Sequence, residues 1–223
     1  GLTGWGWDDV LPHFLKHEDH VAPGPDGMHR AGGEWRVEHP RVRWDILDAV
    51  RDAAAAAGIA RIEDFNTGDN EGSAYFQVNQ RRGWRLSAYR AFLVPALERD
   101  NTRLEIGVMV ERIVIADGRA VAVEFTHNGE ALRVEVLGEI VLSAGAVGSP
   151  AILERSGIGD GARLQALGLD TVLDRPGVGE NLQDHLQIRP VYKVEGVRTL
   201  NTDYAKLWRR PLMALEYAVR RTG

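Results

Sequence analysis

The apolar positions of this chain recur at two spacings, one typical of helices and the other of strands. Residues 44–57 give the clearest helical pattern, and Gly58 follows them as a stop signal. Within this stretch Ile46, Leu47 and Val50 lie on one side of an alanine-rich run. Shorter stretches with the same spacing predict a helix that Asp8 or Asp9 caps, and helices over 88–98, 162–167 and 204–220, the last interrupted by Pro211.

Between residues 102 and 142 the pattern changes to that of a β-sheet. Residues 108–116 and 120–126 are joined by Asp117-Gly118, a dipeptide typical of two-residue hairpin turns. A second turn at 127–130 leads into residues 131–136. We therefore expect a three-stranded antiparallel sheet here. Alternation predicts further strands at 74–78 and 186–194.

The end of this β region differs from the rest. Residues 140–142 are apolar and predict a buried parallel strand, and residues 143–146 then carry almost no side-chain bulk. Ser149 occupies an N-cap position and Pro150 the first position of a helix that ends near Ser156. This geometry can receive a ribose or pyrophosphate, because free N–H groups and the helix dipole point to one place. Alternatively, the small residues serve only to pack a strand tightly against a helix, as in any βα unit.

Composition narrows the class of protein. The 223 residues are 44% hydrophobic, enough for one or two domains with a core. A net charge of −5 gives no basic surface for nucleic acid, and the absence of cysteine excludes disulfides and thiolate metal sites. No apolar run approaches the roughly 20 residues of a membrane span, so we expect a soluble protein. The sequence leaves its location unknown, and we favour the cytoplasm. Because the chain starts at Gly1 within a loop-like sequence, we expect an internal fragment.

Three groups of polar residues suggest chemistry and also have a structural explanation. His13, His17 and His20 fall at roughly helical spacing, but without cysteine or an HExxH motif we expect no metal site. Asp184-His185 pairs an acid with a base, yet sequence neighbours rarely face one another, so we expect no catalytic role. The arginines within residues 81–90 are consistent with phosphate binding and equally with a solvated turn before a helix.

Two motifs resemble those of one enzyme family. Gly145-Ala146, Ser149-Pro150, Ile152-Leu153 and residues 156–159 resemble, position by position, the second signature of the glucose–methanol–choline (GMC) flavoprotein oxidoreductases. Residues 176–185, PGVGENLQDH, resemble the PGVGxNLQDH motif of the same family. Looser matches include residues 27–33 and the Asp-Phe-Asn of residues 64–66. The resemblance covers nearly the whole chain and is closest to the choline dehydrogenase-like members.

The resemblance implies a fold that combines α/β and α+β parts. We expect part of a Rossmann-like FAD-binding domain, with a parallel strand and an antiparallel hairpin, interleaved with part of a substrate-binding domain built on an antiparallel sheet and helices. This chain lacks the GxGxxG turn of the family. It also lacks the family's C-terminal catalytic histidine and the histidine or asparagine that pairs with it. The expected segments are 1–34 as a lid or linker, 35–80 in the substrate domain, 81–185 in the FAD domain, and 186–223 as a second substrate-domain segment.

The resemblance also implies the cofactor and its contacts. The cofactor would be FAD, with the backbone of Val110 at the adenine edge and the adenosine half lying against residues near 145. No catalytic and no metal-binding residue is expected within this chain. The cofactor-binding residues that we expect are Val110, Ser143, Ala144, Gly145 and Ala146.

The implied reaction is hydride transfer from a CH–OH carbon to flavin N5, with a small-molecule alcohol as substrate and an acceptor that the sequence does not identify. Choline-oxidising members carry a glutamate a few residues after the Asp-His pair, where this chain has Lys193, so we favour an uncharged primary alcohol. A gap of one or two residues would instead bring Glu195 there. The alternatives are a choline dehydrogenase, a non-catalytic flavin-binding remnant and a hydroxynitrile-lyase-like protein. We expect the fragment alone to be inactive.

Overall fold

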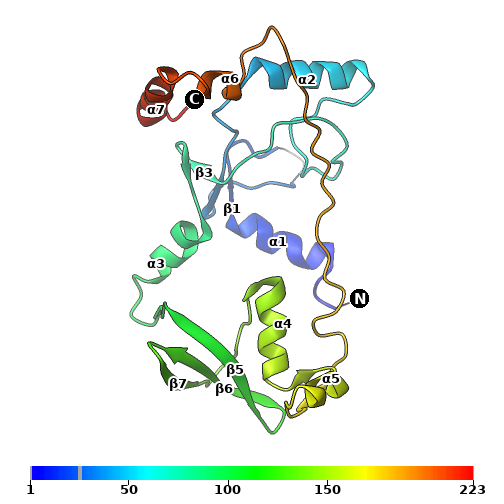
Figure 1. Cartoon of the computed structure of the whole chain (residues 1–223), viewed down its shortest axis with the longest axis vertical. Helices are drawn as coiled ribbons and strands as arrows, with labels where there is room; N and C mark the ends of the chain where they lie inside the picture. The colour runs from blue at the N-terminus through cyan, green and yellow to red at the C-terminus, as the bar shows by residue number, and fades with distance from the viewer. Residues whose placement is uncertain (1, 25–26, 223) are drawn as a thin grey trace. The chain divides into compact units, whose positions relative to one another are not determined.

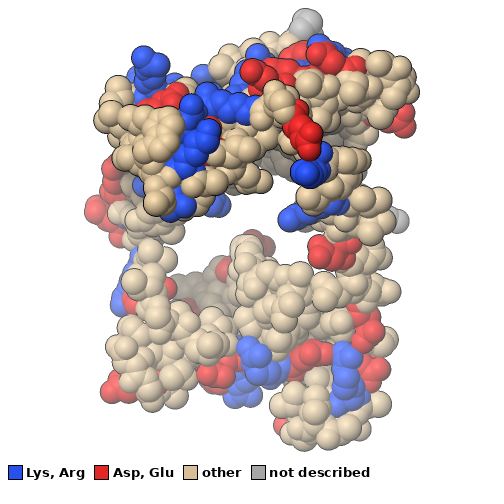
Figure 2. Space-filling model, turned by 45° about the horizontal axis from the view of Figure 1, so that its top comes forward, with Lys and Arg blue, Asp and Glu red and all other residues tan. Residues whose placement is uncertain are grey.

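The computed structural model describes residues 2–24 and 27–222 and divides them into two units (Figure 1). Unit 1 comprises Gly1–Arg103 with Val191–Gly223, and unit 2 comprises Leu104–Pro190. The predicted segments 1–34 and 186–223 include Gly1, Pro25, Asp26 and Gly223, which lie outside the described residues. Figure 2 shows acidic and basic side chains interspersed on the visible face of each unit.

Unit 1 combines helices with two small sheets. Strands β1 and β2 pair in parallel and β3 and β4 pair antiparallel. Its elements are α1 (Trp7–His17), β1 (Glu18–His20), β2 (Trp35–Val37), α2 (Asp45–Ala56), β3 (Gln80–Arg81), β4 (Trp84–Arg85), the π-helical turn η1 (Tyr89–Leu93), α3 (Val94–Ala96), α6 (Leu200–Tyr204) and α7 (Arg209–Arg220).

The first two helices of unit 1 follow local sequence signals. The N-cap residue of α1 is Gly6, so neither Asp8 nor Asp9 occupies the N-cap position. The Asp9 carboxylate, at the third position of the helix, instead accepts a hydrogen bond of 3.0 Å from the N–H of Gly6. Helix α2 ends before Gly58, which has a φ of +89°, as expected for a glycine that stops a helix. The apolar side of α1 is not buried, however, because Phe14 is 68% exposed.

Other predicted elements of unit 1, and the segment 186–194 in which unit 2 ends and unit 1 resumes, differ from the structure. Residues 186–194 form no strand, and residues 74–78 contribute only the isolated bridge between Val78 and Glu38. The helix predicted over 204–220 is divided into α6 and α7, and Pro211 lies in the first turn of α7, where its missing N–H costs no intrahelical bond.

Unit 2 contains the predicted antiparallel sheet. Its elements are β5 (Val108–Ala116), β6 (Arg119–His127), β7 (Glu130–Glu135), α4 (Gly145–Arg155), β8 (Ile158–Gly159), α5 (Gly161–Ala166) and β9 (Leu173–Asp174). The sheet has the order β5-β6-β7, and both turns have two residues with positive φ. These residues are Asp117 with Gly118 and Asn128 with Gly129, so both hairpin predictions are confirmed.

Helix α4 packs on β5 through a buried serine. The N–H of Ile113 donates to Ser156 Oγ at 2.8 Å, and this hydroxyl donates to the carbonyl of Ile152 at 2.6 Å. Leu164, on the following helix α5, is fully buried. The short strands β8 and β9 on either side of α5 pair in parallel. Buried side chains from the sheet, α4 and α5 therefore form the core of unit 2.

The predicted strand at 140–142 is wrong. These residues form no strand, and Val141 is 85% exposed. A buried parallel strand requires neighbouring strands, and none of the described strands pairs with this segment.

The predicted start of the following helix is also wrong, since α4 begins at Gly145 rather than at Pro150. Ser149 Oγ instead accepts from the N–H of Ala144 at 2.9 Å. Pro150 lies inside the helix, which therefore lacks one intrahelical bond there.

Large apolar side chains of unit 2 are exposed. Leu137 and Leu186 are 95% and 94% exposed. Among the helices of the described residues, none is both long and apolar enough to cross a membrane.

Candidate functional site

Residues 143–146 of unit 2 form an exposed stretch of backbone, which we call the ledge. Its four residues, Ser143 to Ala146, are all exposed. Gly145 has a φ of +85°, a conformation that residues with a Cβ rarely adopt. A Cβ built on Gly145 would meet no atom within 4 Å. The glycine therefore serves the backbone conformation and leaves open space above it.

The ledge leads directly into the N-terminus of α4. This helix has no side-chain cap among the described residues, because the residue at its N-cap is Ala144. The first N–H groups of a helix have no intrahelical partner, and the helix dipole is positive at this end. An open backbone next to uncapped N–H groups suits the ribose or phosphate of a nucleotide.

Val110 lies on β5, the strand against which α4 packs. Its carbonyl accepts from Arg155 Nη2 at 3.1 Å, and the carbonyl of Glu111 accepts from Arg155 Nε at 2.7 Å. These contacts place the Val110 carbonyl beside Arg155, the last residue of α4, at the opposite end of this helix from Gly145. The predicted cofactor residues thus belong to one packed pair of elements.

The Asp184-His185 pair is not arranged for proton transfer. Among the described residues, the single polar contact between the two is the backbone N–H of His185 donating to Asp184 Oδ1 at 2.8 Å. Both residues are exposed. The imidazole ring of His185 makes no contact with the carboxylate in the described part of the chain, so this geometry supplies no acid–base pair.

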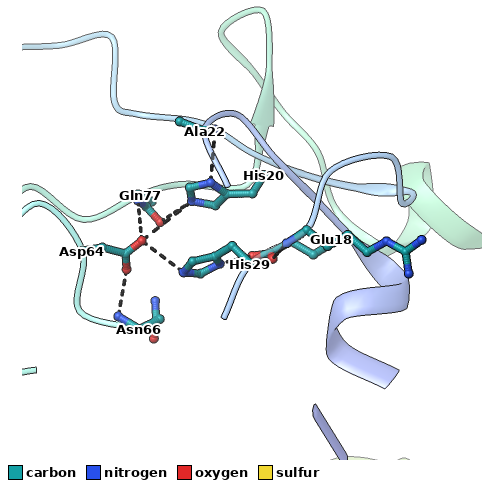
Figure 3. A network of polar contacts seen from close by, with 8 residues as sticks. Glu18, His20, Ala22, His29, Asp64, Asn66 and Gln77 are labelled. Carbon is teal, nitrogen blue, oxygen red and sulfur yellow. Dashed lines mark hydrogen bonds and ion pairs between the residues drawn. The ribbon is translucent and has the colours of Figure 1, made fainter. Parts of the chain in front are cut away.

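Unit 1 holds a cluster of polar side chains that the sequence analysis missed (Figure 3). His29 lies between two carboxylates, with Nδ1 2.8 Å from Glu18 Oε1 and Nε2 3.1 Å from Asp64 Oδ2. The ring of His20 stacks on that of His29 at 4.3 Å, and its Nε2 lies 3.0 Å from Gln77 Oε1. We call these five residues the histidine cluster.

The histidine cluster brings donor atoms of Glu18, His20 and His29 within 4.8 Å of one another, which raises the question of a metal ion. The two imidazole planes differ by only 25°, so their nitrogen lone pairs do not converge on one ion. The N–H of Ala22 donates to His20 Nδ1 at 3.2 Å, which leaves the proton of a neutral ring on Nε2, facing Gln77. We therefore interpret the cluster as a hydrogen-bonded network that joins separate segments. The neighbours of His20 are not His13 and His17, which lie on α1.

Asp64 receives most of the polar contacts of the cluster. Partial burial acts to raise the pKa of its carboxyl, but hydrogen bonds from Asn66 and Gln77 and the nearby His29 and His20 outweigh burial and lower the pKa below its ordinary value. A lowered pKa means that the charged carboxylate stabilises the fold above about pH 4 and that this contribution is lost as pH falls through the folded-state pKa.

We expect Asp64→Asn to lower the free energy of unfolding at neutral pH by about 1–3 kcal/mol, because it removes the carboxylate beside His29. As pH falls from about 4 through the lowered folded-state pKa of Asp64, the difference from the parent should shrink, because the carboxylate of the folded parent becomes protonated. Asp69→Asn is the matched control, since Asp69 also accepts an N–H two residues on, at 3.0 Å. Denaturant unfolding across pH measures both; an equal loss in the two variants would contradict the role of the cluster.

A weak signal for the histidine cluster was present in the sequence. His29 and Asp64 lie in the two loosely matching family segments, residues 27–33 and 64–66. Nothing in their spacing indicates contact, because 34 intervening residues and helix α2 separate them.

Comparison with known proteins gives consistent results over most of the chain. The family profile described as GMC oxidoreductase matches residues 1–187. An oxygen-dependent choline dehydrogenase from Rhizobium johnstonii is 40% identical over 187 residues, which cover 84% of this chain and 34% of that protein. The chain thus spans about a third of the length of this relative.

Two solved structures are also similar to this chain. Pyridoxine 4-oxidase from Mesorbium loti is 35% identical, with a TM-score of 0.71 over 77% of this chain and 34% of that one. An FAD-dependent oxidoreductase from Chaetomium thermophilum has a TM-score of 0.86 over 100% of this chain and 41% of that one, at 23% identity. This second likeness concerns the fold alone.

Proposed function

The chain belongs to the GMC oxidoreductases, a family of FAD-dependent enzymes, and from this premise we propose that it is part of an enzyme that oxidises the CH–OH group of a small alcohol. The observation that carries the proposal is the open ledge at residues 143–146 beside the uncapped N-terminus of α4. Apolar residues exposed in this chain, such as Val141, support the view that further polypeptide of the enzyme covers them.

The ledge residues fit the adenosine half of FAD. Ser143, Ala144, Gly145 and Ala146 are exposed, and although the Ala144 N–H already donates to Ser149 Oγ, the N–H groups at the start of α4 suit the ribose or phosphate. Val110 would offer backbone groups to the adenine edge. When bound, the flavin supplies a hydride acceptor for the alcohol carbon.

The roles of this chain in the reaction are then to bind and to orient. The proton of the alcohol requires a base within hydrogen-bond reach of the substrate. We do not assign that role to His185, because its exposed ring has no partner among residues 2–24 and 27–222 that would position it. The proposed segments 81–185 and 186–223 would belong to the FAD-binding and substrate-binding domains.

The purified 223-residue chain is expected to carry no flavin. It offers the ledge but contains no GxGxxG turn that would hold the pyrophosphate. Visible absorbance of the purified chain, with added FAD followed by gel filtration, measures this. Stoichiometric flavin retained on the chain alone would contradict the expectation.

A chimera tests the proposed function directly. Residues 1–187 would replace the matching third of the Rhizobium johnstonii relative, which supplies the remaining polypeptide. We expect the chimera to retain FAD. We also expect an added alcohol substrate to bleach the absorbance of the bound flavin under anaerobic conditions. A folded chimera that binds no flavin would refute the cofactor assignment. One that binds flavin but is never reduced would favour a non-catalytic or lyase-like role.

For the substrate we propose an uncharged primary alcohol rather than choline. Lys193 and Glu195 pair at 3.4 Å and are both largely exposed, so neither presents a lone negative charge to a trimethylammonium group. Choline is the second candidate, because the Rhizobium johnstonii relative carries that name. Turnover by the complete natural protein separates the two: a kcat/KM for choline above that for benzyl alcohol would overturn the proposal.

A further inference from the structure

Unit 1 contains a cavity of about 610 Å³ that the proposed function does not use. Its wall is made by the segment 40–42, the segment 77–85 and the C-terminal end of α7. These segments lie far apart in the sequence and meet only in the folded unit. The cavity is remote in the chain from the ledge, which belongs to unit 2.

The charges on the cavity wall have one sign. Arg41, Arg85 and Arg221 line it, and the lining contains no aspartate or glutamate. None of the three guanidinium groups forms an ion pair with a carboxylate within the described ranges. Figure 2 shows basic side chains gathered over the part of unit 1 that carries α7. Guanidinium groups without carboxylate partners are a favourable setting for an anion.

Two of these arginines also have a structural use. Arg41 Nη1 donates to the carbonyl of Arg220 at 3.2 Å, at the negative end of the α7 dipole. The guanidinium of Arg221 lies over the rings of Trp84 and Tyr217, at 4.2 and 5.4 Å. Both groups are thereby positioned and still retain hydrogen-bond donors, since each guanidinium has five.

The Arg85 side chain makes no structural contact of the kind that Arg41 and Arg221 make with the described residues. Its side chain makes no hydrogen bond, ion pair or ring contact with the described residues, although its backbone pairs with Gln80. Helix packing and the hairpin therefore explain Arg41 and Arg221 in part but leave Arg85 unexplained. A third guanidinium on the same wall adds to the positive potential of the cavity.

The Gly83 turn keeps the cavity wall together. Gly83 has a φ of +79°, and a Cβ there would approach the Cβ of Arg221. The hydroxyl of Tyr217 donates to the carbonyl of Gly83 at 3.4 Å. The close approach of the hairpin to the end of α7 thus places Arg221 and Arg85 on one wall.

We propose that this cavity binds a small ligand through a phosphate group. A phosphate carries up to two negative charges and accepts from several guanidinium groups at once, which matches a wall of three arginines without an acid. The Asn79 side chain, which also lines the cavity, can donate a further hydrogen bond.

Calorimetric titration of the chain with inorganic phosphate and with pyrophosphate, at constant ionic strength, tests the proposal. We expect saturable binding of one anion per chain and a Kd about tenfold weaker or more in Arg85→Gln, because a charge-assisted hydrogen bond is lost. The fold should be unaffected, since the Arg85 side chain has no partner among the described residues; far-UV circular dichroism checks this.

Arg90→Gln is the matched control, since Arg90 is also exposed and lies outside the cavity wall. Its Kd for phosphate should equal that of the parent. Equal weakening in Arg85→Gln and Arg90→Gln would mean attraction to general surface charge and would overturn the proposal. Absence of saturable binding by a folded parent chain would overturn it as well, leaving the arginines to stabilise α7.

Discussion

Gly145→Ala, introduced into the chimera described above, is expected to weaken FAD retention by about tenfold or more. The new methyl group would enter the open space above the ledge, where we propose that the adenosine half lies. Alanine also resists the φ of +85°, at a cost of about 1–2 kcal/mol, and would shift the N–H groups that start α4. Fluorescence titration of the apo-chimera with FAD gives the Kd.

Gly129→Ala provides the control for backbone strain. Gly129 has a φ of +84° in the second hairpin turn, and a Cβ there also meets no atom within 4 Å. Both variants should therefore lose similar stability, and only Gly145→Ala should lose FAD affinity. Unchanged FAD affinity in a folded Gly145→Ala chimera would mean that the ledge is not part of the cofactor site.

Leu164→Ala should lower the free energy of unfolding by about 2–5 kcal/mol. Leu164 is 0% exposed, and a Cβ on Gly159 would lie 3.5 Å from its Cδ1, so the side chain fills the space between α5 and β8. Truncation removes buried apolar surface and leaves a cavity in a unit with few buried side chains. Denaturant unfolding followed by circular dichroism measures the loss.

Leu167→Ala tests whether burial causes this loss. Leu167 directly follows α5 and is 69% exposed, so its truncation should change stability by less than about 0.5 kcal/mol. Similar losses in both variants would show that α5 is destabilised as a helix and that Leu164 has no special packing role.

The elements predicted correctly are those whose signals lie within a few residues. Asp117-Gly118 and Asn128-Gly129 adopt the positive φ values that tight hairpins need, and this requirement is local. Gly58, which ends α2 with a φ of +89°, acts in the same way. Such residues favour one backbone conformation whatever the remainder of the chain does.

The predictions that failed depend on distant partners. An apolar run such as 140–142 becomes a strand only beside other strands, and no described strand pairs with it. The start of α4 was misplaced because Ser149 and Pro150 resemble a helix start, whereas the helix extends back to Gly145. The conformational preferences of neighbouring residues therefore decided neither the structure of residues 140–142 nor the start of α4.

The candidate sites also include features that the sequence predicted and features that only the folded structure showed. The small residues at 143–146 were visible in the sequence, and so was the family resemblance. The histidine cluster was not, because Glu18, His29 and Asp64 come from separate segments. The arginine cavity likewise needs the hairpin at Gly83 and the end of α7 to meet.

The sequence by itself therefore determined the family, the turns, most helices and the bare backbone at the ledge, because these depend on residue type at neighbouring positions. Tertiary structure alone decided the partners of His29, the wall of arginines and the exposure of residues 140–142. Contacts between distant segments depend on how the whole chain packs, and short-range residue preferences do not encode them.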